Sequence, residues 1–248
     1  EVMVRQGFDP KEFDLRIGFV GAEPHSEQTR QRIEDILDIN AFNSYGMSEL
    51  NGPGVAFECE QKSGMHIWED SYLLEVVNPD TCEALAPGEE GELVVTTIGR
   101  EAMPILRYRT GDLARIVDDG EECSCGRAHV RISRIKGRCD DMLIVKGVNL
   151  YPSQIEDVLM SFPEVATNYQ IIVDRAGRKA LDSLIVQVEL YPKMFDGDLK
   201  KLRTLEADIT GSVQDEIVVR PKIEFLEPGS LPRSEGKAVR VVDKRGEM

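Results

Sequence analysis

The chain has 248 residues, of which 41% are hydrophobic and 30% charged, and this is the composition of a globular protein. Its formal net charge of -15 at pH 7 repels the phosphates of nucleic acids and anionic lipids, so neither is an expected partner. No apolar run approaches the roughly 20 residues of a membrane span. The five cysteines do not form the even framework of a secreted domain, which favours a cytoplasmic protein.

The first predicted elements form an α/β unit. Residues 13–19 alternate like a strand, residues 21–24 predict a turn, and residues 26–37 have helical spacing with Ser26 as a candidate cap. Strand, turn and helix in succession begin an α/β unit. In the middle third, short β-branched runs are separated by Pro, Gly and Asp, which predicts strands in hairpins. These strands are predicted at residues 72–77, 91–96 and 113–117.

The final part of the chain has a third pattern. Its predicted elements are a strand at residues 142–145, a helix at 152–161, strands at 168–173 and 183–189, a helix at 199–213 and a strand at 222–225. This βαββαβ order is that of a ferredoxin-like fold. The polar stretch at residues 137–141 interrupts the patterns on both sides, so we predict two domains, residues 1–138 and 139–248.

Four short segments, in this order and spread over most of the chain, resemble the signature motifs of the adenylate-forming superfamily. They are Tyr-Gly-Met-Ser-Glu at residues 45–49, Tyr-Arg-Thr-Gly-Asp at 108–112, Gly-Arg-Cys-Asp-Asp-Met at 137–142 and Leu-Pro-Arg-Ser-Glu-Gly-Lys at 231–237. Each segment alone is a weak signal, but the ordered set is specific. Three further segments are similar to the phenylacetate-CoA ligase family within this superfamily. These are His-Ile-Trp-Glu-Asp at 66–70, Cys-Ser-Cys-Gly at 123–126 and Ile-Ser-Arg-Ile at 132–135.

The resemblance implies a mixed α+β fold. The first domain would be the C-terminal part of the large adenylate-forming domain, an α/β unit plus a β-rich subdomain, and the second the small mobile C-terminal domain with the ferredoxin-like order. The family's Ser/Thr/Gly-rich loop, which cradles the β- and γ-phosphates, has no match in the chain. We therefore expect the chain to be a fragment that is inactive by itself.

The first two segments would bind the nucleotide. The resemblance implies that Tyr45 stacks on adenine, that the Ser48 hydroxyl meets the α-phosphate, and that Glu49 holds magnesium. These residue types suit the roles, because a flat aromatic face fits a purine and a hard carboxylate fits Mg²⁺. Asp112 would accept hydrogen bonds from both ribose hydroxyls. Taken singly, each segment also reads as an ordinary loop or a β-turn.

Other residues of the nucleotide and CoA sites follow from the same resemblance. The family's adenine-contacting turn is matched by Gly21, Ala22, Glu23 and Pro24, a stretch that equally reads as a plain connection. In the third segment, Arg138 would touch the ribose and Asp140 would be the hinge between the domains. Gly147 would lie in the loop presented to coenzyme A. The alternative for this segment is an inert linker.

The fourth segment would supply the catalytic Lys237, which Arg240 follows. The resemblance places Lys237 at the acyl carboxylate and the α-phosphate, where a cation lowers the barrier as negative charge accumulates. A phosphate-binding P-loop is excluded here, because Gly229 and Gly236 are too far apart and Ala238 stands where Ser or Thr would ligate magnesium.

A structural zinc site is a separate hypothesis. Its candidate ligands are Cys59, His66, Cys123 and Cys125, two ligand pairs in turn-like sequence of the β-rich region. The gaps depart from the usual zinc-ligand spacing, one being tighter and the other wider. The alternative is four unrelated residues, with the cysteines as small buried side chains.

The function predicted for the full-length protein is ATP-dependent ligation of a carboxylic acid, aryl or arylacetic, to coenzyme A through an acyl-adenylate. The partners are then the acid, ATP with magnesium, and coenzyme A, and a homodimer is compatible with this reading. Two alternatives stay open. The acyl group could pass to an amine or a carrier protein, or the chain could be a non-catalytic nucleotide-binding module.

Overall fold

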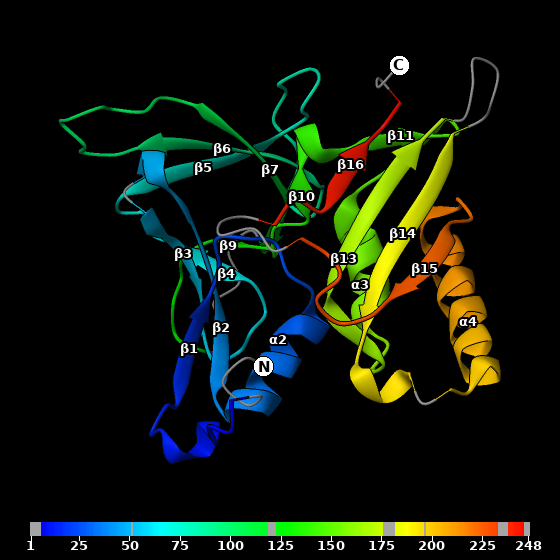
Figure 1. Ribbon diagram of the computed structural model, residues 1–248. Helices are drawn as coiled ribbons and strands as arrows, with labels where there is room; N and C mark the ends of the chain where they lie inside the picture. Colours follow the sequence, from blue (N-terminus) through cyan, green and yellow to red (C-terminus); the bar gives the residue numbers. More distant parts are fainter. Residues whose placement is uncertain are drawn as a thin grey trace. The chain divides into compact units, whose positions relative to one another are not determined.

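The computed structural model describes residues 6–50, 52–118, 123–175, 182–195, 197–232 and 238–245. The chain divides into two compact units, one of residues 1–24 and 30–140 and the other of residues 25–29 and 141–248 (Figure 1). No helix among the described residues is long and apolar enough to cross a membrane.

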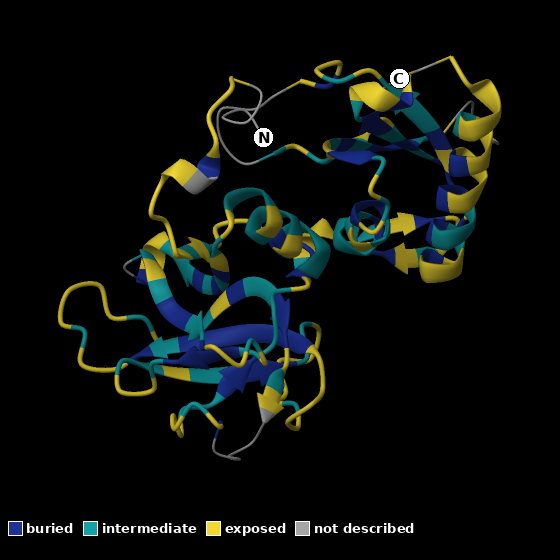
Figure 2. Cartoon of the chain, turned by 90° about the horizontal axis from the view of Figure 1, so that it is seen from below, coloured by how far each residue is buried: buried dark blue, intermediate teal, exposed yellow. Residues whose placement is uncertain are grey.

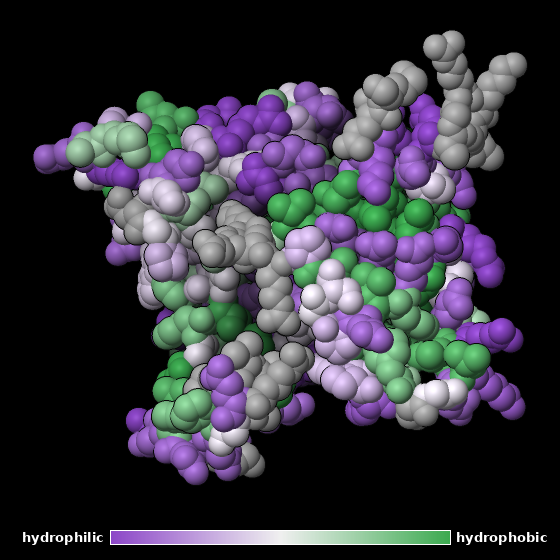
Figure 3. Space-filling view, in the orientation of Figure 1, coloured by the Kyte–Doolittle hydropathy of each residue, from purple (hydrophilic) through white to green (hydrophobic). Residues whose placement is uncertain are grey.

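The first unit begins with a strand-helix-strand segment. After the short helix η1 (Pro10–Glu12) come β1 (Ile17–Val20), α2 (Glu27–Leu37) and β2 (Asn40–Met47), and the two strands are parallel. The strand predicted from residue 13 begins later, because Leu15 N–H donates to the Phe13 carbonyl in a tight turn. Apolar side chains remain exposed along β1, where Figure 3 shows apolar atoms gathered at the lower left.

β1 and β2 belong to a six-stranded sheet with the order β1-β2-β3-β4-β9-β8. Its further strands are β3 (Gly52–Glu58), β4 (Met65–Ile67), β9 (Arg131–Ile132) and β8 (Ile116–Asp118). These further strands pair antiparallel with their neighbours. The one-turn helix η2 (Ser48–Leu50) connects β2 to β3.

The second sheet of this unit is antiparallel and has the order β10-β7-β6-β5. Its strands are β5 (Tyr72–Val77), β6 (Gly91–Thr97), β7 (Tyr108–Ala114) and β10 (Gly137–Arg138). The strand predicted at residues 113–117 is divided, because β7 ends at Ala114 and β8 begins in the other sheet. The two sheets share one core, in which Val55, Ile67, Leu93 and Ile132 are fully buried (Figure 2).

The second unit packs two helices against a four-stranded sheet (Figure 1). Its elements are η3 (Cys139–Asp141), which leads into it, then β11 (Leu143–Val145), β12 (Val148–Leu150), α3 (Pro152–Met160), β13 (Val165–Asp174), β14 (Ser183–Leu190), η4 (Pro192–Met194), α4 (Leu199–Ile217), β15 (Lys222–Leu226) and β16 (Val241–Asp243). The fully buried Ile155 of α3, Ile209 of α4 and Val186 of β14 meet in the core.

The predicted ferredoxin-like order is wrong. The sheet has the order β15-β14-β13-β16, and β11 pairs with β12 in a separate hairpin. The reason is local: Lys146 and Gly147 have φ of 52° and 79°, the left-handed values of a two-residue hairpin turn, so β11 finds its partner at once. The sheet is completed by β16, which pairs parallel to β13 and has no counterpart among the predicted strands.

Candidate nucleotide site and candidate metal centre

Asp112 is the centre of a hydrogen-bonded cluster in the first unit. The Tyr45 hydroxyl donates to Asp112 Oδ2 at 2.8 Å, and Arg138 Nη1 donates to Asp112 Oδ1 at 3.4 Å. The three side chains come from β2, β7 and β10, and Arg138 stands opposite Asp112 in the register of β10 with β7. The structure therefore brings together three residues that the sequence places at the nucleotide.

Tyr45 is a buried member of this cluster, with 6% of its surface exposed. Burial, followed by the negative charge of Asp112, raises the pKa of the Tyr45 phenol well above its ordinary value. The hydroxyl therefore stays protonated and keeps donating to the carboxylate. Only a small part of the ring surface is open to a ligand, so the predicted stacking on adenine would use that part alone.

Arg138 connects the cluster to the predicted hinge. Its guanidinium donates to the Thr110 carbonyl at 3.2 Å and to both carboxylate oxygens of Asp140, at 2.8 and 3.2 Å. The hydrogen bond from Arg138 is the first cause that lowers the pKa of Asp140. Asp140 therefore stays ionised at neutral pH, paired to the arginine that also contacts Asp112.

Ser48 and Glu49 lie exposed in η2, directly after Tyr45 on β2. The backbone there is tightly held: Arg100 donates to the Glu49 carbonyl, and the Tyr72 hydroxyl donates to the Leu50 carbonyl at 2.8 Å. A Cβ at Gly46 would come within 2.0 Å of the Gly52 carbonyl oxygen, so only glycine fits there. The segment thus offers a hydroxyl and a carboxylate to solvent from a fixed backbone.

Gly21, Ala22, Glu23 and Pro24 form the turn that follows β1. The Ser44 hydroxyl of β2 donates to the Val20 carbonyl at 3.4 Å, which ties the end of β1 to the strand that carries Tyr45. The turn and the tyrosine are therefore held by neighbouring parallel strands at the same sheet edge.

Cys59, His66, Cys123 and Cys125 also come together, and their ligand atoms all lie within 4.8 Å of one another. The Cys59 and Cys123 sulfurs are 3.7 Å apart, and the Cys125 sulfur is 3.5 Å from His66 Nε2. Tetrahedral zinc with its usual bond lengths gives ligand separations of about 3.8 Å between two sulfurs and about 3.6 Å between sulfur and nitrogen. The donor set and its spacing fit zinc.

Strand pairing explains how this cluster forms. Cys59 follows β3, His66 lies on the adjacent β4, and the two cysteines at 123 and 125 precede β9, which pairs with β4. His66 Nδ1 lies 3.2 Å from the His129 carbonyl oxygen, so this nitrogen carries the proton and Nε2 presents its lone pair to the cluster. A second hydrogen bond of this kind commonly orients a histidine ligand.

Three of the four candidate ligands are buried, and Cys125 is partly buried. Cys59, His66 and Cys123 are 6%, 2% and 5% exposed. Burial lowers the pKa of His66, which keeps the imidazole neutral. Burial raises the pKa of the Cys125 thiol, but hydrogen bonds with Arg127, Cys123 and Cys59 together outweigh burial and bring this pKa down to about 7. Zinc binds neutral imidazole and thiolate.

In the second unit, Gly147 occupies the turn between β11 and β12, and Lys237 lies outside the described residues. Before it, Leu231 N–H donates to the buried Glu189 carboxylate at 2.9 Å. After it, the Arg240 guanidinium lies 4.5 Å from the centre of the Tyr169 ring. Leu231 and Arg240, the described residues on either side, therefore contact residues of the sheet.

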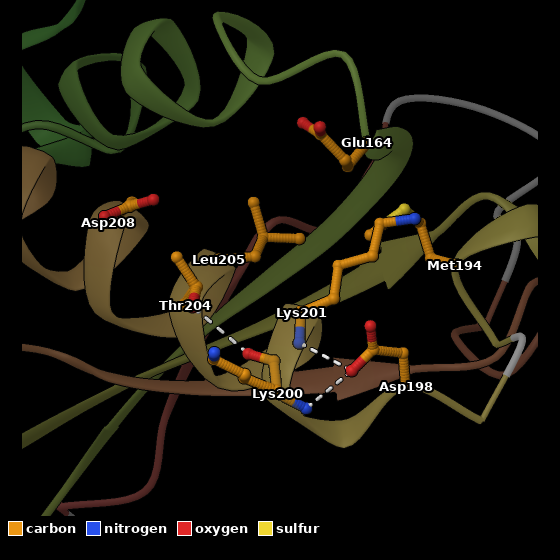
Figure 4. A pocket seen from close by; sticks show the side chains of 8 residues that line it. All are labelled: Glu164, Met194, Asp198, Lys200, Lys201, Thr204, Leu205 and Asp208. Atoms are coloured by element: carbon orange, nitrogen blue, oxygen red, sulfur yellow. Dashed lines mark hydrogen bonds between the residues drawn. The ribbon is translucent and has the colours of Figure 1, made fainter.

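A cavity of about 340 Å³ on the second unit contains none of the predicted site residues (Figure 4). It lies at the start of α4, where Asp198 caps the helix by accepting from the backbone N–H groups of Lys200 and Lys201 at 3.0 and 3.2 Å. The Asp198 carboxylate therefore completes the end of the helix.

Glu92 is a buried carboxylate next to the Asp112 cluster for which the sequence predicts no role. It lies on β6, is 3% exposed, and contacts the segment that carries Asp112. The available signal was a carboxylate within an otherwise apolar strand, Gly-Glu-Leu-Val-Val. A charged residue in such a run needs a partner if it is buried.

Matches to known proteins extend over nearly the whole chain. Residues 147–245 match the family model described as AMP-binding enzyme C-terminal domain. The phenylacetate-coenzyme A ligase of Thermus thermophilus is 44% identical over 97% of this chain and 56% of its own length. That of Escherichia coli is 42% identical over 99% of this chain and 55% of its own length. The chain thus spans about half the length of these relatives.

Solved structures show the same fold. The crystal structure of 2-hydroxyisobutyryl-CoA ligase, in the postadenylation state with 2-HIB-AMP, superimposes with a TM-score of 0.89 and 30% sequence identity. The match covers 98% of this chain and 51% of that one. The mixed α/β fold predicted from the sequence is confirmed as that of the adenylate-forming ligases, apart from the ferredoxin-like order corrected above.

Proposed function

We propose that this chain, which belongs to the phenylacetate-CoA ligase family, is part of an enzyme that joins a carboxylic acid to coenzyme A with ATP. The observation that carries the proposal is the cluster of Tyr45, Asp112 and Arg138, three residues far apart in the sequence that share hydrogen bonds. An ionised carboxylate offers acceptor sites for several donors, so Asp112 can accept from ribose hydroxyls while Tyr45 and Arg138 orient it.

The reaction proceeds in two steps. A carboxylate oxygen of the acid attacks the α-phosphorus of ATP, which releases pyrophosphate and forms the acyl-adenylate. The thiol of coenzyme A, as thiolate, then attacks the acyl carbon, and AMP leaves with the oxygen that bridged carbon and phosphorus. Adenylation is needed because a free carboxylate is a poor electrophile. The acids we propose are aryl or arylacetic acids.

The remaining site residues have separate tasks in this proposal. The Ser48 hydroxyl contacts the α-phosphate, and the exposed Glu49 carboxylate holds Mg²⁺, a hard cation that prefers oxygen ligands. Lys237 stabilises the charge that develops where carboxylate and phosphate join. Gly147, at the tip of an exposed hairpin, faces coenzyme A in the second step.

The test is isotope exchange in a full-length protein that contains this chain. Labelled pyrophosphate should enter ATP only when a suitable acid is present, and a panel of aryl, arylacetic and aliphatic acids identifies the substrate class. Addition of coenzyme A should then give the thioester. Exchange without thioester formation would favour an amine or carrier-protein acceptor. Absence of exchange with every acid would contradict adenylation and leave a nucleotide-binding module.

We also propose that Cys59, His66, Cys123 and Cys125 bind one structural zinc ion. Four protein ligands close the coordination sphere, so no position is left for a substrate. The ion would join the end of β3, β4 and the segment before β9. Its contribution would be to the stability of the six-stranded sheet and not to the reaction.

A further inference from the structure

We propose that Glu92 is a positioning residue for Asp112, and that its carboxylate determines how strongly the site distinguishes ribose from deoxyribose. The inference rests on the proposed function, because it requires Asp112 to bind the ribose. Glu92 itself is buried on β6 and cannot reach a ligand in solvent. It would act only through the backbone that presents Asp112.

The pairing of β6 with β7 shows why a side chain is needed at this position. Glu92 pairs with Leu113 and Val94 pairs with Arg109, so three residues of β7, 110 to 112, stand opposite the single residue Leu93. Such a bulge removes residues from the regular ladder and redirects their side chains. The backbone groups of the bulge must then find partners other than the neighbouring strand.

Glu92 supplies one of these partners. Its Oε1 accepts the Gly111 N–H at 3.0 Å, immediately before Asp112 in the chain. Gly111 has φ of 78°, and a Cβ there would lie 2.7 Å from Arg138 Nη2, so the bulge requires glycine with its N–H aimed at the carboxylate. Glu92 thus holds the peptide between Thr110 and Gly111, one residue before Asp112.

The Thr110 hydroxyl supports the same backbone segment. Its hydroxyl donates to the Leu93 carbonyl at 3.0 Å and accepts the Asp112 N–H at 3.0 Å. The N–H groups at 111 and 112 are therefore both satisfied by side chains, one by Glu92 and one by Thr110. Loss of either acceptor would free part of the backbone that leads into Asp112.

Arg109 holds the carboxylate of Glu92 in place. Its Nε donates to Glu92 Oε2 at 2.8 Å, and a second guanidinium N–H reaches the same oxygen. The guanidinium also donates to the Pro79 carbonyl at 2.7 Å. Charge-assisted hydrogen bonds of this kind are stronger than neutral ones, so Glu92 is a fixed support.

The readout is the preference for AMP over 2′-deoxy-AMP and 3′-deoxy-AMP in equilibrium binding to a full-length protein that contains this chain. A hydrogen bond to a charged group corresponds to about tenfold or more in affinity, so the wild type should prefer AMP by that order. Glu92→Gln replaces one acceptor oxygen by a donor. It should reduce the preference for AMP to about one third of the wild-type value or less. Asp112→Asn should remove most of it, and the double variant should lose no more than Asp112→Asn alone.

The matched control is Glu75→Gln. Glu75 lies on β5, which pairs with β6, and it also accepts two hydrogen bonds from an arginine, Arg107. No hydrogen bond or ion pair joins Glu75 to residues 110–112, all of which the structure describes. This variant should keep the wild-type preference. If Glu92→Gln does not fold, Arg109→Lys takes its place, since one ammonium group cannot reproduce the guanidinium contacts, and it should lower the preference in the same direction.

Three results would overturn the inference in distinguishable ways. If Asp112→Asn reduces the preference for AMP but Glu92→Gln or Arg109→Lys leaves it unchanged, the proposed ribose site stands and the role of Glu92 is wrong. If the wild type does not distinguish the three nucleotides, the ribose role of Asp112 fails and that of Glu92 with it. A loss of affinity equal for all three nucleotides in Glu92→Gln would indicate a merely structural residue.

Discussion

The guanidinium of Arg138 and the carboxylate of Asp140 are joined by two hydrogen bonds, at 2.8 and 3.2 Å, across a single intervening residue. The same guanidinium donates to Asp112 at 3.4 Å. One side chain therefore connects the proposed ribose ligand with the proposed hinge.

Removal of this ion pair should affect the reaction more than the stability. The Arg138 and Asp140 side chains are 41% and 67% exposed, so the pair contributes less than about 1 kcal/mol to folding. Asp140→Ala should leave the unfolding midpoint nearly unchanged and slow thioester formation from acyl-adenylate several-fold, because the hinge backbone is altered. Lys222→Ala, which breaks an exposed pair with Glu224 on β15, is the control. Equal rates in Asp140→Ala and wild type would exclude Asp140 as the hinge.

Asp182 gives a pH-dependent prediction for the second unit. Its buried carboxylate accepts from Arg175 at 2.7 Å and from Arg245 at 3.2 Å, and the hydrogen bond from Arg175 is the first cause that lowers its pKa. A lowered folded-state pKa stabilises the protein above the unfolded value of about 3.9, and this stabilisation is lost as the pH falls through the folded value. Asp182→Asn should therefore lower the free energy of unfolding by about 1 kcal/mol at pH 7.

The difference in unfolding free energy between Asp182→Asn and wild type should become smaller below about pH 4, because the wild-type carboxylate itself becomes protonated there. Urea unfolding at pH 7 and at successively lower pH measures it. Asp215→Asn, at an exposed position on α4, serves as the matched control and should behave like wild type at every pH. A difference that stays constant from pH 7 to pH 3 would show that the charge of Asp182 is not the cause.

The zinc proposal predicts about one zinc ion per chain in protein purified without chelator. Cys125→Ser should lose the metal and destabilise the first unit by more than about 4 kcal/mol, the range in which loss of a structural metal falls. Cys82→Ser is the matched control, since Cys82 is an exposed cysteine outside the cluster. Protein that is free of metal and equally stable with and without chelator would rule the site out.

Lys237 should matter in only one half-reaction. Lys237→Ala in the full-length protein should lower acid-dependent pyrophosphate exchange by on the order of 10²-fold or more, the effect of losing one charge contact in a closed site. Conversion of preformed acyl-adenylate to the thioester should continue at a rate close to wild type. Pyrophosphate exchange at the wild-type rate in this variant would show that Lys237 has another role.

Much of the fold could be predicted from local sequence. The helices near residues 152 and 199 and the strands near 168 and 183 were predicted because their apolar periodicity extends over several turns or pleats. The arrangement of strands could not be predicted in the same way. The left-handed turn at Lys146 and Gly147 pairs β11 locally, and this depends on two backbone angles that no periodicity reveals.

For the candidate site, too, some residues could be predicted from the sequence, and others depend on how the strands pair. Tyr45, Asp112 and Arg138 were predicted from the sequence by resemblance to three separate motifs, and the structure brings them into hydrogen-bonding contact. Glu92 was missed, because its role depends on a bulge that places three residues opposite one. The spacing of the four metal-ligand candidates was a weak signal, since their approach depends on the pairing of β3, β4 and β9.

The most direct test of the central claim follows the oxygen atoms of the acid. A full-length protein containing this chain is given ATP, coenzyme A and the acid selected by the exchange assay, with both carboxylate oxygens labelled as ¹⁸O. Mass spectrometry of the products then locates the label. If the carboxylate attacks the α-phosphorus, AMP carries one ¹⁸O atom and the thioester keeps the other. Label in inorganic phosphate or pyrophosphate, or AMP without label, would contradict an acyl-adenylate.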